Sequence, residues 1–202
     1  RQFFSSVFRT LDLGLAMAMT GNRVLKDIKL LLENPVVGVV IVDDIENPMN
    51  FDAFITGPEG TGYDGGIFKV DVDVPAQFPM KPPSIHFTTP IFHPNIADFD
   101  GYICLDLLDQ EWYPSITIGN CLEAIHGLLS DPNPHSPLNG AAAQIYLHDR
   151  EMYRKTCQTW TYHFANGSSP VQEYEAKIWR MMAQGKTKKA AISRLTDRRW
   201  EE

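Results

Sequence analysis

The sequence has few cysteines, no long hydrophobic run and no excess of positive charge. Its 202 residues include three cysteines, none in a CxxC pair, which argues against a disulfide framework and a cysteine zinc site and fits a reducing compartment, the cytoplasm or the nucleus. No apolar run approaches the roughly 18 residues of a membrane span. The net charge of -7 argues against a general nucleic-acid binder. We therefore expect no bound metal, membrane or nucleic acid.

The order of sequence patterns predicts an α+β fold. A helix over about 21–33, capped by Thr20, precedes four strands, the third of which alternates apolar and charged residues as a half-buried antiparallel strand does. Helices follow, and on the last one Tyr153, Cys157, Trp160 and Phe164 share one face. We predict a four-stranded antiparallel meander flanked by helices; its strands cover 36–42, 51–56, 67–74 and 84–87, and the later helices cover 117–130, 139–147 and 149–164.

The segment from Phe92 to Trp112 carries the candidate chemistry. Pro94 restricts its own backbone and that of His93, so a rigid turn can aim the amide of Asn95. Apolar neighbours alternate with Cys104, which predicts that its thiol faces outward and is reactive. The alternative is a buried structural cysteine, because free cysteine is among the most buried residue types.

The same segment resembles the active-site block of ubiquitin-conjugating enzymes. The similarity lies in His93-Pro94-Asn95-Ile96, then Gly101-Tyr102-Ile103-Cys104-Leu105-Asp106, then Trp112 and Pro114. It continues in Tyr63-Asp64-Gly65-Gly66, in Phe78-Pro79-Met80-Lys81-Pro82-Pro83 and in Asp131-Pro132-Asn133-Pro134, and it covers roughly residues 22–165. The resemblance implies the ubiquitin-conjugating (UBC) fold.

The resemblance also implies a reaction. Cys104 would accept ubiquitin as a thioester and transfer it to lysine amines of substrates or of ubiquitin. Asn95 would hold its turn and donate to the oxyanion, while Asp106 and Ser136 would orient the incoming lysine or gate the site. His93 and Pro94 would be structural. No cofactor is implied, since ATP is used by the activating enzyme.

Three alternatives stay open beside this reading. A Cys/His hydrolase would use His93 as the base for Cys104. A non-catalytic ubiquitin-binding adaptor would use the fold without the chemistry, although such variants lack the cysteine. A conjugating enzyme for a ubiquitin-like modifier would use the same residues on another donor.

The expected partners are ubiquitin, the activating enzyme, ligases of RING or HECT type, and protein substrates. Basic residues of the first helix, Arg23 and Lys26, match positions that meet the activating enzyme and the ligase in the resembled family. Met80, in the proline-rich loop, and Pro114 and Ser115 match the ligase-docking loops. The ordinary alternative for the basic residues is a solvated helix face.

The ends of the chain are assigned to extensions. We expect a poorly ordered N-terminal extension over 1–19, a catalytic core over 20–166, and a linker with a partial helical extension over 167–202. The spacing of apolar residues from Ile178 to Trp200 resembles a ubiquitin-associated (UBA) domain, particularly that of the 25-kilodalton family member. The alternative is an amphipathic tail followed by a basic helix.

Overall fold

An antiparallel sheet of four strands forms the centre of the protein. The computed structural model describes residues 20–41 and 45–165, so the expected N-terminal and UBA-like extensions lie outside the described residues. The strands are β1 (Val39–Ile41), β2 (Asn50–Thr56), β3 (Ile67–Asp73) and β4 (Ser84–Phe87), and they neighbour one another in chain order. The meander predicted from the sequence is thus present.

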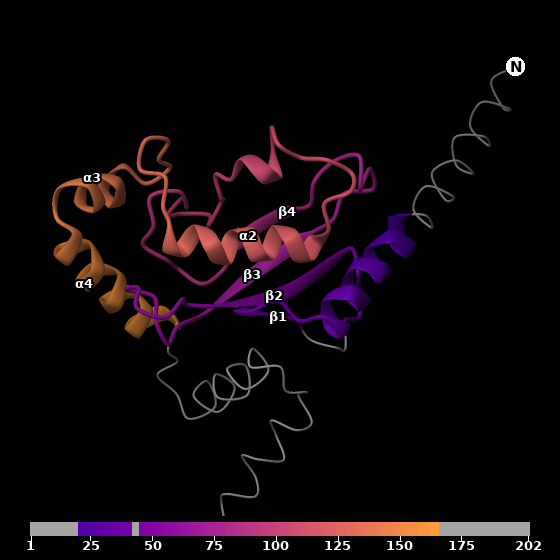
Figure 1. Ribbon diagram of the computed structural model, residues 1–202, viewed down its shortest axis with the longest axis horizontal. Helices are drawn as coiled ribbons and strands as arrows, with labels where there is room; N and C mark the ends of the chain where they lie inside the picture. Colours follow the sequence, from indigo (N-terminus) through magenta and orange to yellow (C-terminus); the bar gives the residue numbers. More distant parts are fainter. Residues whose placement is uncertain (1–19, 42–44, 166–202) are drawn as a thin grey trace, which may run out of the picture.

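Helices pack on the sheet and at its two ends (Figure 1). A first helix, described from residue 20 to residue 33, lies at one end, and α2 (Ile118–Ser130) crosses the sheet. The other end carries α3 (Gly140–His148) and α4 (Arg150–Trp160), which continues into the short π-helix η2 (Thr161–Ala165). The layers are those of an α+β fold.

Apolar periodicity explains why α2 forms and where it packs. Thr117 caps its first turn in a reciprocal capping box with Asn120, which satisfies two backbone N–H groups. Its inward face is buried, and Leu122 and Ile125 are fully so. Burying one such side chain stabilises the fold by about 1.5–3 kcal/mol, so this face anchors the helix to the sheet.

Three local predictions were wrong. Thr20 is itself helical, whereas a capping residue would be non-helical, and its hydroxyl donates to the carbonyls of Ala76 and Phe78 at 3.0 and 3.1 Å. The first strand begins only at Val39, because the chain before it forms a turn: the N–H of Val39 donates to the carbonyl of Val36 at 3.1 Å, and Gly38 takes a φ of 78°. Phe164 is 50% exposed, since α4 gives way at Thr161 to a wider turn that changes the register of the helical face.

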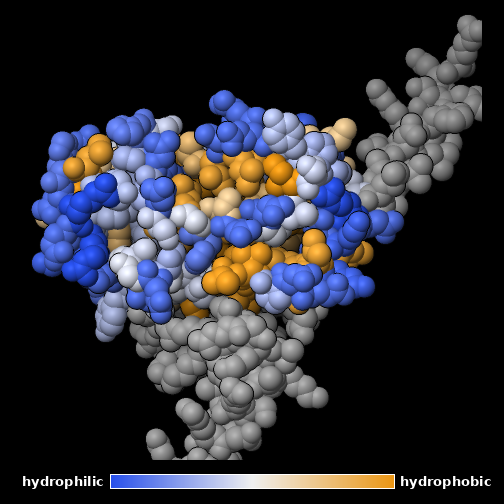
Figure 2. Space-filling view, viewed as in Figure 1, coloured by the Kyte–Doolittle hydropathy of each residue, from blue (hydrophilic) through white to orange (hydrophobic). Residues whose placement is uncertain are grey.

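The surface of the α2 face is mixed. Figure 2 shows hydrophilic side chains toward both ends of this face and hydrophobic patches near its middle. Within the described residues, no helix is long and apolar enough to cross a membrane.

Candidate active site

A tight hairpin presents Cys104. The backbone N–H of Cys104 donates to the carbonyl of Asn95 at 2.9 Å, and that of Ala97 donates to the carbonyl of Tyr102 at 2.9 Å. Gly101 turns the hairpin with a φ of 68°, and a Cβ there would collide with the carbonyl oxygen of Phe87. Only glycine combines this backbone with this close approach, so the turn and the edge of β4 together fix the position of Cys104.

Cys104 differs from the other two cysteines in exposure. It is half-buried, whereas Cys121 and Cys157 are fully buried. Burial raises the pKa of Cys121 to about 12 and also raises the pKa of Cys157, because an apolar surrounding disfavours the thiolate. Since the thiolate is the nucleophile, Cys104 is the thiol that can react.

His93 is completely buried and is used within its own turn. Its Nδ1 accepts the backbone N–H of Asn95 at 3.0 Å, so its Nε2 carries the proton and donates to the carbonyl of Leu128 at 3.0 Å. Burial lowers the pKa of His93 to about 4, against the smaller opposing effect of the Leu128 carbonyl. A neutral imidazole with both nitrogens engaged has no position left from which to activate Cys104.

The side chain of Asn95 joins the cysteine hairpin to the loop that faces it. Its Nδ2 donates to the carbonyls of Asn133 and Ser136 at 2.7 and 3.1 Å, and its Oδ1 accepts the backbone N–H of Asn133 at 2.8 Å. The neighbouring carbonyl of Pro94 accepts the N–H groups of residues 138 and 139. The loop is therefore held at the cysteine by the His93-Pro94-Asn95 turn.

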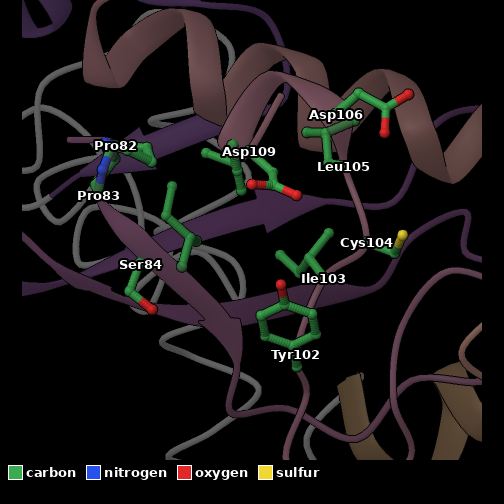
Figure 3. Close-up of a pocket in the computed structure, with 11 residues that line it drawn as sticks. Pro82, Pro83, Ser84, Tyr102, Ile103, Cys104, Leu105, Asp106 and Asp109 are labelled. Atoms are coloured by element: carbon green, nitrogen blue, oxygen red, sulfur yellow. The ribbon is translucent and has the colours of Figure 1, made fainter. Parts of the chain in front are cut away.

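Asp106 and Ser136 approach the site from different elements. Asp106 begins the 3-10 helix η1 (Asp106–Leu108), and its carbonyl accepts the N–H groups of Asp109 and Glu111 at 3.0 and 2.8 Å. In Figure 3 its carboxylate and the sulfur of Cys104 lie on the same side of the segment. Ser136 is exposed and reaches the site through the carbonyl that Asn95 holds.

The expected partner-binding residues fall into two groups. Lys26, Pro114 and Ser115 are exposed, and Met80 is 75% exposed. Arg23 is instead only partly exposed, and its guanidinium is engaged with groups of the protein itself. It pairs with Asp27 at 2.9 Å and donates to the carbonyls of residues 114 and 116 at 2.9 and 3.0 Å. Arg23 thus holds the loop on which Pro114 lies.

Two supporting residues were not anticipated from the sequence. Asp27, only 3% exposed, accepts the first backbone N–H of α2 from Ile118 at 3.2 Å, so it links the first helix to α2. Tyr63 donates its hydroxyl to the carbonyl of Phe92 at 2.7 Å, next to the turn. The i, i+4 spacing of Arg23 and Asp27 was the available signal for Asp27. Tyr63 lies in the Tyr63-Asp64-Gly65-Gly66 stretch of the family resemblance, but that stretch did not indicate its contact with the turn. No group of His, Cys, Asp and Glu within the described ranges is placed to hold a metal ion.

The fold and the site define an α+β enzyme with a single accessible cysteine beside a rigid Pro-Asn turn. The profile of the ubiquitin-conjugating enzyme family matches residues 23–161. Ubiquitin-conjugating enzyme E2 21 of Caenorhabditis elegans is 36% identical over 156 residues, which are 77% of this chain and 73% of that protein.

Solved structures agree with this match. The E2 domain of a Toxoplasma gondii ubiquitin-conjugating enzyme is 35% identical, with a TM-score of 0.66 over 71% of this chain and 97% of the other. A Plasmodium yoelii structure described as such an enzyme is 39% identical, with a TM-score of 0.67 over 72% of this chain and 94% of the other. The chain belongs to the ubiquitin-conjugating enzyme family, whose members are acyltransferases that work through a cysteine thioester. The particular likeness to the 25-kilodalton member is not confirmed.

Proposed function

We propose that the protein accepts ubiquitin from the activating enzyme on Cys104 and transfers it to lysine amines of substrates or of ubiquitin, with or without a ligase. The observation that carries the proposal is a contrast among the three thiols. Cys104 is half-buried and its backbone N–H donates a hydrogen bond to the carbonyl of Asn95, whereas the other two thiols are fully buried. The thiolate of Cys104 attacks the activating enzyme's thioester carbonyl. A new C–S bond forms, and the activating enzyme's thiolate leaves.

In the second step a neutral lysine amine attacks the carbonyl carbon of the Cys104 thioester. The C–N bond forms, the C–S bond breaks, the Cys104 thiolate leaves, and the nitrogen releases one proton to water. Sulfur suits both steps because a thiolate is a good nucleophile and a better leaving group than an amine. The exposed carboxylate of Asp106, on the same side as the thiol, attracts the lysine as its ammonium form, which releases a proton to water before the neutral amine attacks, and Ser136 borders the approach path.

Asn95 acts in this scheme mainly by holding the facing loop. Both of its amide hydrogens are directed to backbone carbonyls, so donation to an oxyanion requires one of these bonds to be exchanged. Such a donor is typically worth about 2.7–4 kcal/mol of barrier. Asn95→Ala should therefore leave charging nearly intact and slow the discharge to lysine.

The partner surface consists of Lys26, Met80, Pro114 and Ser115, with Arg23 as the residue that positions the loop. Lys26 and Met80 extend into solvent and are free to contact an activating enzyme or a ligase of RING or HECT type. Lys26→Ala should weaken partner-dependent steps and leave stability unchanged. Arg23→Ala should lower both the rate of the partner-dependent steps and the stability, because Arg23 donates a hydrogen bond to the carbonyl of Pro114.

A charging assay tests the proposal. The protein is incubated with activating enzyme, ATP and ubiquitin, and parallel reactions contain ubiquitin-like modifiers. An adduct should form with ubiquitin, disappear on reduction, be absent in Cys104→Ala, and decay when free lysine is added. If an adduct formed with a ubiquitin-like modifier and not with ubiquitin, that modifier would be the donor in place of ubiquitin. Charging that is followed only by hydrolysis, with no lysine product, would overturn transfer.

A further inference from the structure

A second recognition feature lies beside the nucleophile. A cavity of about 240 Å³ is lined by residues 82–85 from the loop that enters β4, and by residues 102–106, 108 and 109 from the cysteine hairpin and η1. Cys104 is part of its lining, as Figure 3 shows. The cavity is smaller than the roughly 300–1,000 Å³ of pockets that bury drug-sized ligands, so a single long side chain is a suitable occupant.

The lining combines apolar walls with one inward-facing carboxylate. Pro82, Leu105 and Leu108 contribute apolar surface. Asp109 directs its carboxylate into the cavity, where the hydroxyl of Tyr102 also points, while Asp106 points to the other side (Figure 3). Within the described residues, no ion pair or side-chain hydrogen bond involves the carboxylate of Asp109. An aliphatic stem along the walls with a cationic end at Asp109 would match this lining.

The chain around the cavity is negatively charged, as Asp109 is. From residue 82 to residue 149 the sequence contains eight Asp or Glu residues and no Lys or Arg. The preceding residue, Lys81, is exposed and forms no ion pair within the described part of the chain. An incoming cation would therefore meet a negative field over the segment that carries the cysteine.

We propose that this cavity binds a lysine or arginine side chain that flanks the acceptor lysine of the substrate. The inference rests on the proposed function and adds a preference for basic acceptor segments. Side chains on one face of an extended segment repeat every two residues, about 6.5–7 Å. Because Cys104 itself lines the cavity, the flanking cation lies within about three residues of the acceptor lysine. Asp109 is the specificity-determining residue of this subsite.

The test is single-turnover discharge of the charged protein to peptides that contain one lysine. Arg, Gln or Glu is placed in turn at each of the three positions on either side. At one or more positions the Arg peptide should react roughly two- to five-fold faster than the Gln peptide, the range expected of one exposed ion pair. The preference should shrink as the salt concentration rises, because the Debye length, about 10 Å at 0.1 M, becomes shorter and the ion pair is screened.

Variants separate the cavity from the general acidic surface. Asp109→Asn should remove the preference, and Asp109→Arg should shift it toward Glu peptides. Asp98→Asn also removes one negative charge near Cys104, but from the hairpin and outside the cavity, and it should retain the preference. Discharge to free lysine measures whether each variant keeps its basal activity, and should not change in these three variants.

The outcomes distinguish this inference from the proposed function. Normal charging with no flanking preference, or a preference that survives Asp109→Asn, would overturn the subsite. Equal loss in Asp98→Asn would assign the preference to the overall field and also reject the cavity. Slower charging in Asp109→Asn, with unchanged peptide preference, would assign the cavity to the donor. Failure to form any thioester would reject the proposed function itself.

Discussion

Replacing Asn95 by alanine tests the idea that the turn holds the facing loop. The side chain is 1% exposed and makes three hydrogen bonds, of 2.7, 2.8 and 3.1 Å, to the backbone of Asn133 and Ser136. Each bond is worth about 1 kcal/mol net, and an abandoned buried partner costs about 1–3 kcal/mol. Water can reach these part-buried partners, so we expect Asn95→Ala to lower the free energy of unfolding by about 2–4 kcal/mol.

Urea unfolding with linear extrapolation measures this change. Asn34→Ala is the matched control, because Asn34 is exposed and makes one long bond of 3.4 Å; its effect should stay within about 0.5 kcal/mol. Asn95→Asp keeps the acceptor for Asn133 but turns a carboxylate toward two carbonyls. It should therefore be at least as destabilising as Asn95→Ala.

The same variants give a kinetic result. Loss of the loop contact should slow lysine discharge more than charging, in parallel with the loss of stability. An Asn95→Ala protein with unchanged unfolding free energy but a discharge rate lowered by roughly 10²–10³, the cost of one oxyanion donor, would refute the reasoning. In that case Asn95 would act on the reaction directly and the loop would not depend on it.

Three further outcomes follow from buried groups near the site. One thiol, Cys104, should react quickly with an aromatic disulfide reagent in the folded protein, with Cys121 and Cys157 reacting only on unfolding; two fast thiols would contradict the burial. Burial lowers the pKa of His93 to about 4, and an unfolded histidine titrates near 6.5, so between pH 6.5 and 4 the imidazole of residue 93 is protonated only in the unfolded chain. The free energy of unfolding of the wild type should therefore fall by up to about 3 kcal/mol more than that of His93→Gln over this range. An NMR titration of the folded protein with a His93 midpoint near 6.5 would contradict the lowered pKa. Tyr63→Phe should cost about 1–3 kcal/mol in urea unfolding, since its hydroxyl donates to a buried carbonyl at 2.7 Å; an unchanged midpoint would show that this bond contributes nothing.

The sheet and the outward orientation of the half-buried Cys104 could be predicted because their signals are local. Alternation along Ile67–Asp73 gave the third strand within one residue of its end. The same alternation around Cys104 gave an outward thiol between Ile103, which is buried, and Leu105, which is partly buried. A period of two residues separates the faces of an extended segment wherever one face is buried.

The contacts around the site could not be predicted in the same way, because they join distant segments. The amide of Asn95 bonds to the backbone of Asn133 and Ser136, 38 and 41 residues away. No local sequence pattern predicts which distant carbonyls an amide will bond to. Thr20 was misjudged for the same reason: its hydroxyl found the carbonyl of Phe78 58 residues away. The motif resemblance supplied the residues of the site, while the geometry supplied their partners.

The central claim is that Cys104 carries the acyl group, and the bond to that residue tests it most directly. Activating enzyme, ATP and ubiquitin are added to wild type and to Cys104→Ser, and the products are examined by intact mass and peptide mapping, before and after reduction. The account predicts a one-ubiquitin adduct on residue 104 that reduction removes from wild type, and a reduction-resistant ester in Cys104→Ser. A reduction-sensitive adduct that persists in Cys104→Ser would contradict the account.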